Sequence, residues 1–176
     1  MAYSKNEIRT YTGVYMDPFA MRQEQVRIGD IAHSLSLMTR ANGHLNRFFS
    51  IAQHCLNCAK EARARGMGSR IRLACLLHDA AECYLADIPR PVKRRLSGYA
   101  EAEKRVTNTV FAAFGIGDLS EEEQKAVNEI DDAMLYFEFF TLAGAKVSEY
   151  EPHVAAYPDF CEKTMIEVER EFLKEF

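Results

Sequence analysis

From Asp30 onward, apolar residues recur with the period of an α-helix, and glycine or proline breaks separate the periodic segments. Helices joined by short connections can bury their apolar stripes only by packing them together, as in a helical bundle. The sequence therefore predicts an all-α domain. The expected helices cover residues 30–40, 48–65, 69–85, 99–114 and 120–142, and a last one runs from Pro158-Asp159 toward Phe176.

The first thirty residues have a different character. Short segments with β propensity, at residues 9–12 and 25–28, flank the turn signal Asp17-Pro18. They predict a small hairpin or an extended flap. A chain of 176 residues is too short to divide, so we expect one domain. Its parts are the N-terminal flap (1–30), the helical core (30–143) and the C-terminal helix (144–176).

The composition argues against several classes of protein. The formal net charge is −4 and there is no basic stripe, which argues against a nucleic-acid partner. No apolar run approaches the roughly 20 residues of a membrane span, and the first residues lack the apolar segment of a signal peptide. Five cysteines, an odd number, indicate reduced thiols. We therefore expect a cytoplasmic protein with no membrane partner.

One carboxylate interrupts the apolar stripe of the helix expected at 120–142. Asp131 falls in the middle of that stripe, whereas Asp132 falls on the polar side. A buried, unpaired carboxylate costs on the order of several kcal/mol, so a partner must compensate it. The partner could be a residue of a neighbouring helix or a metal ion.

Two other expected helices carry inward-facing polar residues. His54 shares a face with apolar residues of the helix expected at 48–65. His78 and Asp79 are adjacent in the helix expected at 69–85. A lone buried histidine is usually a satisfied core residue. Two histidines and two aspartates on three helices form the nitrogen and oxygen donor set of Mn²⁺, Co²⁺, Fe²⁺ or Zn²⁺. Helix bundles hold such metal sites in their cores.

The order of these residues, H…HD…D, resembles the HD superfamily of metal-dependent phosphohydrolases. The segments SIAQH (50–54) and LHDAAE (77–82) are similar to two of its motifs. The segment ADIPRPVK (86–93) resembles the bacterial 5′-deoxynucleotidase branch. Segments between residues 10 and 44 are similar to a prophage-associated group of HD phosphohydrolases, and the resemblance as a whole covers about residues 9 to 140.

The resemblance implies a metal centre and an acidic pair. One divalent ion would be held by His54, His78, Asp79 and Asp131. Glu82 and Asp87 would be catalytic: one orients or deprotonates a water, and the other assists departure of the nucleoside oxygen. Taken alone, Glu82 could instead orient His78, and Asp87 could be a turn residue before the prolines.

The same resemblance implies substrate contacts. Arg40 lies near the position of a phosphate-binding arginine in relatives, although by itself it could be a solvated cation. His44 and Arg90 are further candidates for contacts with the substrate. In the deoxynucleotidase branch a tryptophan after the arginine helps to recognise the sugar, but here Ala41 follows and the chain has no tryptophan. We therefore expect a weak preference for deoxyribonucleotides.

The expected function is removal of phosphate from a nucleoside 5′-monophosphate. Alternatives are a nucleotide pyrophosphohydrolase, a ppGpp-type hydrolase, or a non-catalytic HD module with the metal as a structural clamp.

The pair Cys55 and Cys58 is expected to fill helix contacts as buried thiols. Relatives dimerise and the last segment is rich in apolar residues, so we expect a homodimer. Those residues are Phe160, Ile166, Phe172, Leu173 and Phe176.

Overall fold

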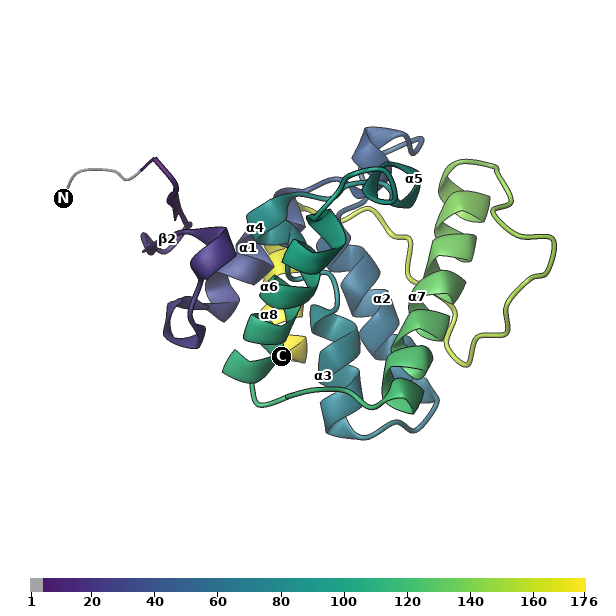
Figure 1. Cartoon of the computed structure of the whole chain (residues 1–176). Helices are drawn as coiled ribbons and strands as arrows, with labels where there is room; N and C mark the ends of the chain where they lie inside the picture. The colour runs from purple at the N-terminus through teal and green to yellow at the C-terminus, as the bar shows by residue number, and fades with distance from the viewer. Residues whose placement is uncertain (1–4) are drawn as a thin grey trace.

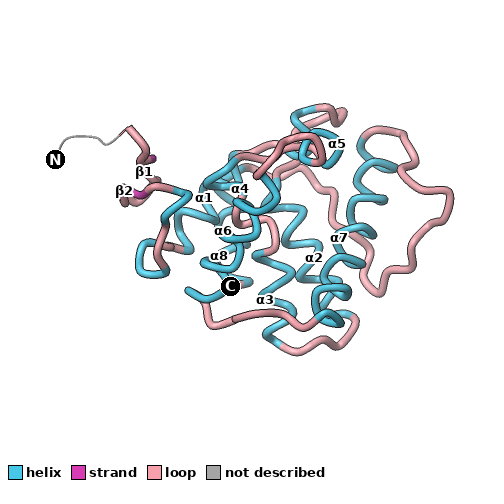
Figure 2. Tube along the Cα trace, viewed as in Figure 1, coloured by secondary structure: helices cyan, strands magenta, loops and turns pink. Residues whose placement is uncertain are grey.

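Helices dominate the computed structural model, which describes residues 5–176 (Figures 1 and 2). The expected all-α class is therefore confirmed. The α-helices are α1 (Ile28–Leu37), α2 (Ile51–Ala64), α3 (Ser69–Leu77), α4 (Glu82–Leu85), α5 (Arg90–Lys93), α6 (Tyr99–Ala113), α7 (Glu121–Leu142) and α8 (Met165–Glu175).

The predicted N-terminal hairpin is present but small. Strands β1 (Ile8–Arg9) and β2 (Tyr15–Met16) pair antiparallel, and the turn between them contains Gly13 at a positive φ of 89°. Asp17 does not separate the strands as expected. Its side chain accepts a hydrogen bond from the backbone N–H of Phe19 and caps the short 3₁₀ turn η1 (Pro18–Ala20). A second 3₁₀ turn, η2 (Gln23–Gln25), precedes α1.

Helix α7 begins where the sequence predicts. The Ser120 hydroxyl accepts a hydrogen bond from the Glu123 backbone N–H, and the Glu123 carboxylate accepts one from the Ser120 N–H. This capping box satisfies two backbone groups that a helix start would otherwise leave unpaired. Ser50 and Gln53 form the same arrangement at the start of α2, three residues beyond the expected position of residue 48.

The helix expected at 69–85 is interrupted. Residues 78–81 form a turn between α3 and α4, in which hydrogen bonds join residues three positions apart. The Ala80 N–H donates to Leu77 O, and the Glu82 N–H donates to Asp79 O, both at 3.0 Å. Apolar periodicity does not separate such tight turns from an α-helix, because their side chains keep a similar spacing. His78 and Asp79 therefore lie on a turn rather than within a helix.

The last helix begins later than expected, at the Thr164–Glu167 capping box. Residues 143–164 instead form a long connection that extends past the end of α7 (Figure 1). Side chains of α2 hold this connection by its backbone. Asn57 exchanges two hydrogen bonds with Asp159, and the buried Glu61 carboxylate accepts the N–H groups of Ala155 and Ala156.

Helix α2 is the centre of the core and contacts α1, α3, α7 and α8. Figure 1 shows α2 and α3 side by side, with α7 on one flank and α1 and α8 on the other. Val168 and Phe172 of α8 are fully buried, so this helix belongs to the core. Phe172 is therefore not available to a dimer interface, whereas Ile166, Leu173 and Phe176 remain exposed. The homodimer stays a prediction.

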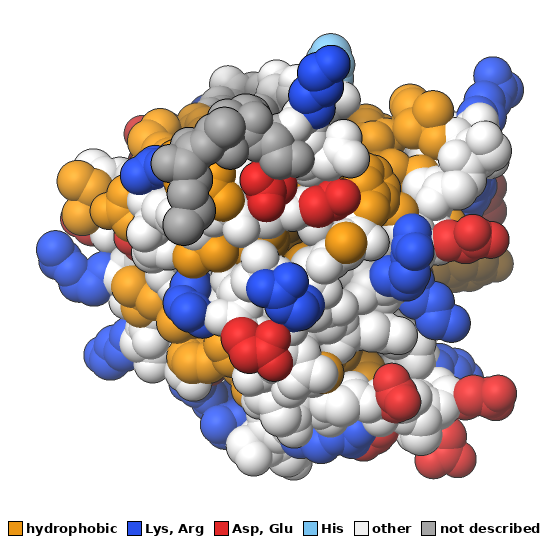
Figure 3. Space-filling model, turned by 60° about the vertical axis from the view of Figure 1, so that its left-hand side comes forward, with side chains coloured by type: hydrophobic (Ala, Val, Ile, Leu, Met, Phe, Trp, Pro, Cys, Tyr) orange, Lys and Arg blue, Asp and Glu red, His pale blue; other side chains and the backbone are white. Residues whose placement is uncertain are grey.

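The surface shows mixed charge. On the face drawn in Figure 3, basic and acidic side chains are interspersed with small apolar areas. Within residues 5–176, no helix has the length and apolar content needed to span a bilayer.

Candidate metal centre

Four side chains from three parts of the chain meet in the core. His54 comes from α2, His78 and Asp79 from the turn after α3, and Asp131 from the middle of α7. The Nε2 atom of His54 lies 3.2 Å from Nε2 of His78 and 3.1 Å from Oδ1 of Asp131. The Nε2 atom of His78 lies 3.3 Å from Oδ1 of Asp79. The structure thus brings together the four residues that the sequence proposes as ligands.

The other nitrogen of each imidazole has a partner. His54 Nδ1 lies 2.5 Å from Oε1 of the buried Glu138, and His78 Nδ1 donates to the carbonyl oxygen of Cys75 at 2.8 Å. Such partners fix the orientation of a metal-ligating histidine and leave Nε2 to face the ion. Both Nε2 atoms therefore point toward the two aspartates.

These donor atoms fit a single divalent transition metal. Donors placed about 2.0–2.2 Å from one ion lie roughly 3 to 3.6 Å apart. The distances that join the two histidine Nε2 atoms to each other and to the aspartate oxygens run from 3.1 to 3.7 Å. Imidazole nitrogens and carboxylate oxygens are also donors that Mn²⁺, Co²⁺, Fe²⁺ and Zn²⁺ accept. The geometry and the chemistry of this cluster are both compatible with a metal site.

Two thiols lie beside the same histidines. His54, Cys58 and His78 form one compact donor group, and Cys55, His78 and Asp79 form another. The Cys58 Sγ atom lies 3.5 Å from His54 Nε2. Burial raises the pKa of Cys55 to about 11 and that of Cys58 well above its ordinary value. The two thiols are therefore protonated neighbours of the histidines when no ion is bound, and the histidines and aspartates remain the proposed ligand set.

The aspartates create a field that favours a cation. Burial alone would raise the pKa of Asp131, but hydrogen bonds from His54 and His78 outweigh it and hold that pKa well below its ordinary value. Burial lowers the pKa of His78, but the negative charge of Asp79 and the hydrogen bond to Asp131 raise it well above its ordinary value. Positive charge, as a proton or as a metal ion, is thus stabilised between these groups.

Arg40 lies over the cluster. Its Nη1 atom is 3.3 Å from Oδ2 of Asp79, and its Nε donates to Oε2 of Glu138 at 3.3 Å. Arg40 begins the 3₁₀ turn η3 (Arg40–Gly43), in which Ala41 and Asn42 have positive φ angles of 52° and 51°. Non-glycine residues in this region carry strain, which is often found at functional sites. The turn presents the guanidinium to the acidic side chains.

A cleft of about 530 Å³ opens at the cluster, and the proposed acidic pair lines it. Glu82 is 3% exposed, and its Oε2 has no hydrogen-bond partner among residues 5–176. Burial, together with the negative charges of Asp79 and Asp87, raises the pKa of Glu82 well above its ordinary value. Asp87 is half-buried on the wall of the same cleft. Both carboxyl groups can therefore reach a molecule bound there.

The candidate substrate contacts occupy different positions in the cleft. Arg40 lies at its inner end, and His44 is an exposed residue of its lining. Arg90 also lines the cleft, but it is engaged with two carboxylates. Its Nη2 lies 2.6 Å from Oδ2 of Asp131, and its Nη1 lies 2.5 Å from Oδ1 of the exposed Asp132. Arg90 therefore holds the oxygen of Asp131 that faces away from the histidines.

The structure adds residues that the sequence did not assign to the site. The Nζ atom of Lys93 lies 3.4 Å from Oε1 of Glu82. In the sequence, Lys93 begins the basic run Lys93-Arg94-Arg95, and nothing there sets it apart from the two arginines. Leu135, Phe139 and Val147 line the apolar part of the cleft. The spacing of four between Asp131, Leu135 and Phe139 was a usable signal, because it places all three on one helix face.

Comparison with known proteins gives relatives but no activity. No protein-family model matches the chain. It is 33% identical to the uncharacterized protein YfdR of Escherichia coli K12 over 109 residues. This matched segment is 62% of this chain and 58% of that protein. The chain thus spans less than two thirds of that relative. It is 36% identical over 141 residues, 76% of this chain, to the uncharacterized protein RCAP_rcc00048 of Rhodobacter capsulatus, and covers 70% of it. The chain therefore belongs to the same protein family as RCAP_rcc00048.

Proposed function

We propose that the chain is a metal-dependent phosphohydrolase of the HD superfamily that removes phosphate from nucleoside 5′-monophosphates. The main support is that a nitrogen and oxygen donor set lies beside one cleft, whose lining includes both aspartates of that set, an arginine and two further carboxyl groups. His54, His78, Asp79 and Asp131 would hold the ion. A divalent metal bound there would lower the pKa of a water and polarise a phosphoryl oxygen.

The other residues of the cleft would serve the phosphate and the protons. The planar guanidinium of Arg40 suits a phosphate group, which carries the same kind of oxygens as the carboxylates it now contacts. Glu82 and Asp87 would divide the two proton transfers, one to orient or deprotonate water and the other to assist the departing nucleoside oxygen. Arg90 would keep Asp131 oriented through its ion pair.

Metal analysis and a phosphate-release screen test this proposal. The purified chain should contain one divalent ion, and it should release phosphate from at least some nucleoside monophosphates. Excess chelator should abolish the release, and Mn²⁺, Co²⁺, Fe²⁺ or Zn²⁺ should restore it. Full activity in chelator would contradict the metal centre. Turnover of nucleoside di- or triphosphates without turnover of monophosphates would favour the pyrophosphohydrolase alternative.

A further prediction concerns how strongly the site distinguishes deoxyribose from ribose. Ala41 lines the cleft next to Arg40, so the methyl group offers little surface against which a sugar could be discriminated. A site rejects a wrong sugar strongly only when it clashes with it or leaves buried groups unpaired. We therefore expect kcat/KM for dAMP and AMP to differ far less than in enzymes that have a tryptophan here. A deoxy preference of about 10³-fold, roughly 4 kcal/mol, would show that another residue has this role.

A further inference from the structure

One face of α7 connects the candidate metal centre to an apolar wall. Asp131, Leu135 and Phe139 follow at intervals of four residues and all line the 530 Å³ cleft. Residues so spaced lie above one another on a helix. At a rise of 1.5 Å per residue, Leu135 lies about 6 Å and Phe139 about 12 Å from Asp131 along the axis. The face thus changes from charged to apolar over the length of a small organic molecule.

Other parts of the chain add apolar surface to the same cleft. Ile88, Pro89, Pro91 and Val147 line it, beside the basic side chains of Arg90, Lys93 and Arg94. The cleft therefore offers an apolar surface as well as the charged groups at the candidate metal centre, which suits a ligand with an anionic part and an apolar part.

The ring of Phe139 differs from its aromatic neighbours. Tyr136 contacts Phe137 and stacks on Phe140 at 6.1 Å between ring centroids, and Phe137 also contacts Tyr157. Phe139 has no aromatic partner among residues 5–176, is only half-buried and faces the cleft. A half-buried aromatic side chain that lines a cleft is a suitable surface for a flat ring.

We propose that the apolar part of the cleft binds the base of the nucleotide and that Phe139 is a specificity-determining residue that packs against it. This inference rests on the proposed function, because it takes the phosphate to lie at Arg40 and the metal ligands. The sugar then spans the region beside Leu135, and the base reaches Phe139 and Val147. The enzyme accordingly selects phosphomonoesters that carry an aromatic ring one sugar away from the phosphate.

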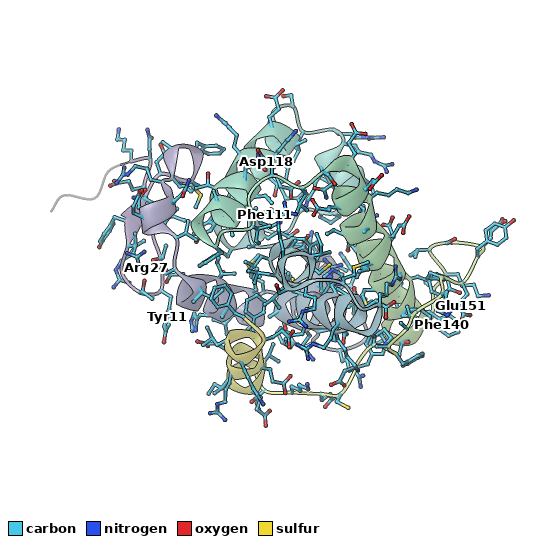
Figure 4. All side chains as sticks on the ribbon, turned by 90° about the horizontal axis from the view of Figure 1, so that it is seen from below. Tyr11, Arg27, Phe111, Asp118, Phe140 and Glu151 are labelled. Carbon is cyan, nitrogen blue, oxygen red and sulfur yellow. The ribbon has the colours of Figure 1, made fainter. Side chains whose placement is uncertain are left out.

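The experiment compares a substrate that has a base with one that lacks it. For Phe139→Ala, kcat/KM for AMP should fall about tenfold, mainly through KM, since loss of a base–aromatic contact has an effect of this order. Turnover of ribose 5-phosphate, which has no base, should stay within about twofold. Phe140→Ala is the matched control, because Phe140 is exposed on the outer side of α7 (Figure 4). It should leave both substrates unchanged.

The outcomes separate this inference from the proposed function. If the unaltered chain releases phosphate from no nucleoside monophosphate, the proposed function is wrong; if another monophosphate is a better substrate than AMP, it replaces AMP in this comparison. If it hydrolyses AMP but Phe139→Ala affects both substrates equally, or affects neither, the base subsite is wrong. Phe139→Leu preserves much of the packing of α7, so it tests the inference even if the alanine variant does not fold. It should show the same selective loss at about threefold, and an unselective loss would again overturn the inference.

Discussion

Asp131→Asn should lose the bound metal and about 10³-fold or more in kcat/KM, whereas Asp132→Asn should retain both. Oδ1 of Asp131 lies within 3.1 to 3.7 Å of both histidine Nε2 atoms. An amide there removes the negative charge and presents a weaker donor to an ion. A metal ion at this site would be worth several kcal/mol of transition-state stabilisation, and about 1.4 kcal/mol corresponds to a factor of ten.

The neighbouring carboxylate is the matched control for this experiment. The side chain of Asp132 is 61% exposed and, within residues 5–176, forms an ion pair with Arg90 alone, so its loss should change activity less than about tenfold. Metal content is measured on both variants together with the rate of phosphate release. Retention of metal by Asp131→Asn, or its loss from Asp132→Asn, would contradict the assignment of the ligand.

Glu61→Gln should lower the free energy of unfolding by about 2–3 kcal/mol at pH 7. The carboxylate of Glu61 is fully buried, and it accepts the N–H groups of Ala155 and Ala156 and the Nε–H of Arg65, the last at 2.7 Å. A neutral amide keeps one acceptor oxygen and places an NH₂ group against a donor, which leaves buried groups unsatisfied. Urea denaturation measures the change.

This loss should depend on pH in a defined direction. Burial raises the pKa of Glu61, but the hydrogen bonds from Ala155, Arg65 and Ala156 outweigh it and lower the pKa below its ordinary value. The contribution to stability is therefore complete above about pH 4.5, the range of an unfolded glutamate, and disappears as the pH falls through the lower folded pKa. The difference between the two proteins should shrink over that interval.

The exposed Glu151 provides the control for Glu61. It lies in the same connection and at the outer edge of the molecule (Figure 4). Glu151→Gln should change stability by less than about 0.5 kcal/mol at any pH tested. An equal effect of the two substitutions, or a larger Glu61 effect in acid than at pH 7, would show that the buried hydrogen bonds are not its cause.

The sequence predicted the features that depend on local patterns. The capping box at Ser120 gave the start of α7, and helical periodicity separated inward Asp131 from outward Asp132. The last helix was placed too early because Pro158-Asp159 is a plausible helix start. Only the tertiary contacts of Asn57 and Glu61 show that this stretch is bound as a connection.

The candidate site was predictable to the same degree. Its four proposed ligands stood out because each interrupts an apolar pattern or belongs to the H…HD…D order. The ion pairs of Arg90 and the place of Val147 in the cleft depend on how α5, α7 and residue 147 meet, and a single sequence carries no signal for that packing. Contacts between distant segments are fixed by tertiary structure rather than by propensity.

The distribution of the donor atoms along the chain also affects how the protein assembles. His54 and His78 are 24 residues apart, and Asp131 lies far beyond both on α7. An ion held by all of them would act as a cross-link that closes two loops, and a cross-link is most effective when the enclosed loops are long. During synthesis the chain could complete this cross-link only after α7 had left the ribosome and docked against α2 and α3. Metal uptake would therefore follow the docking of α7 rather than begin the folding of the chain.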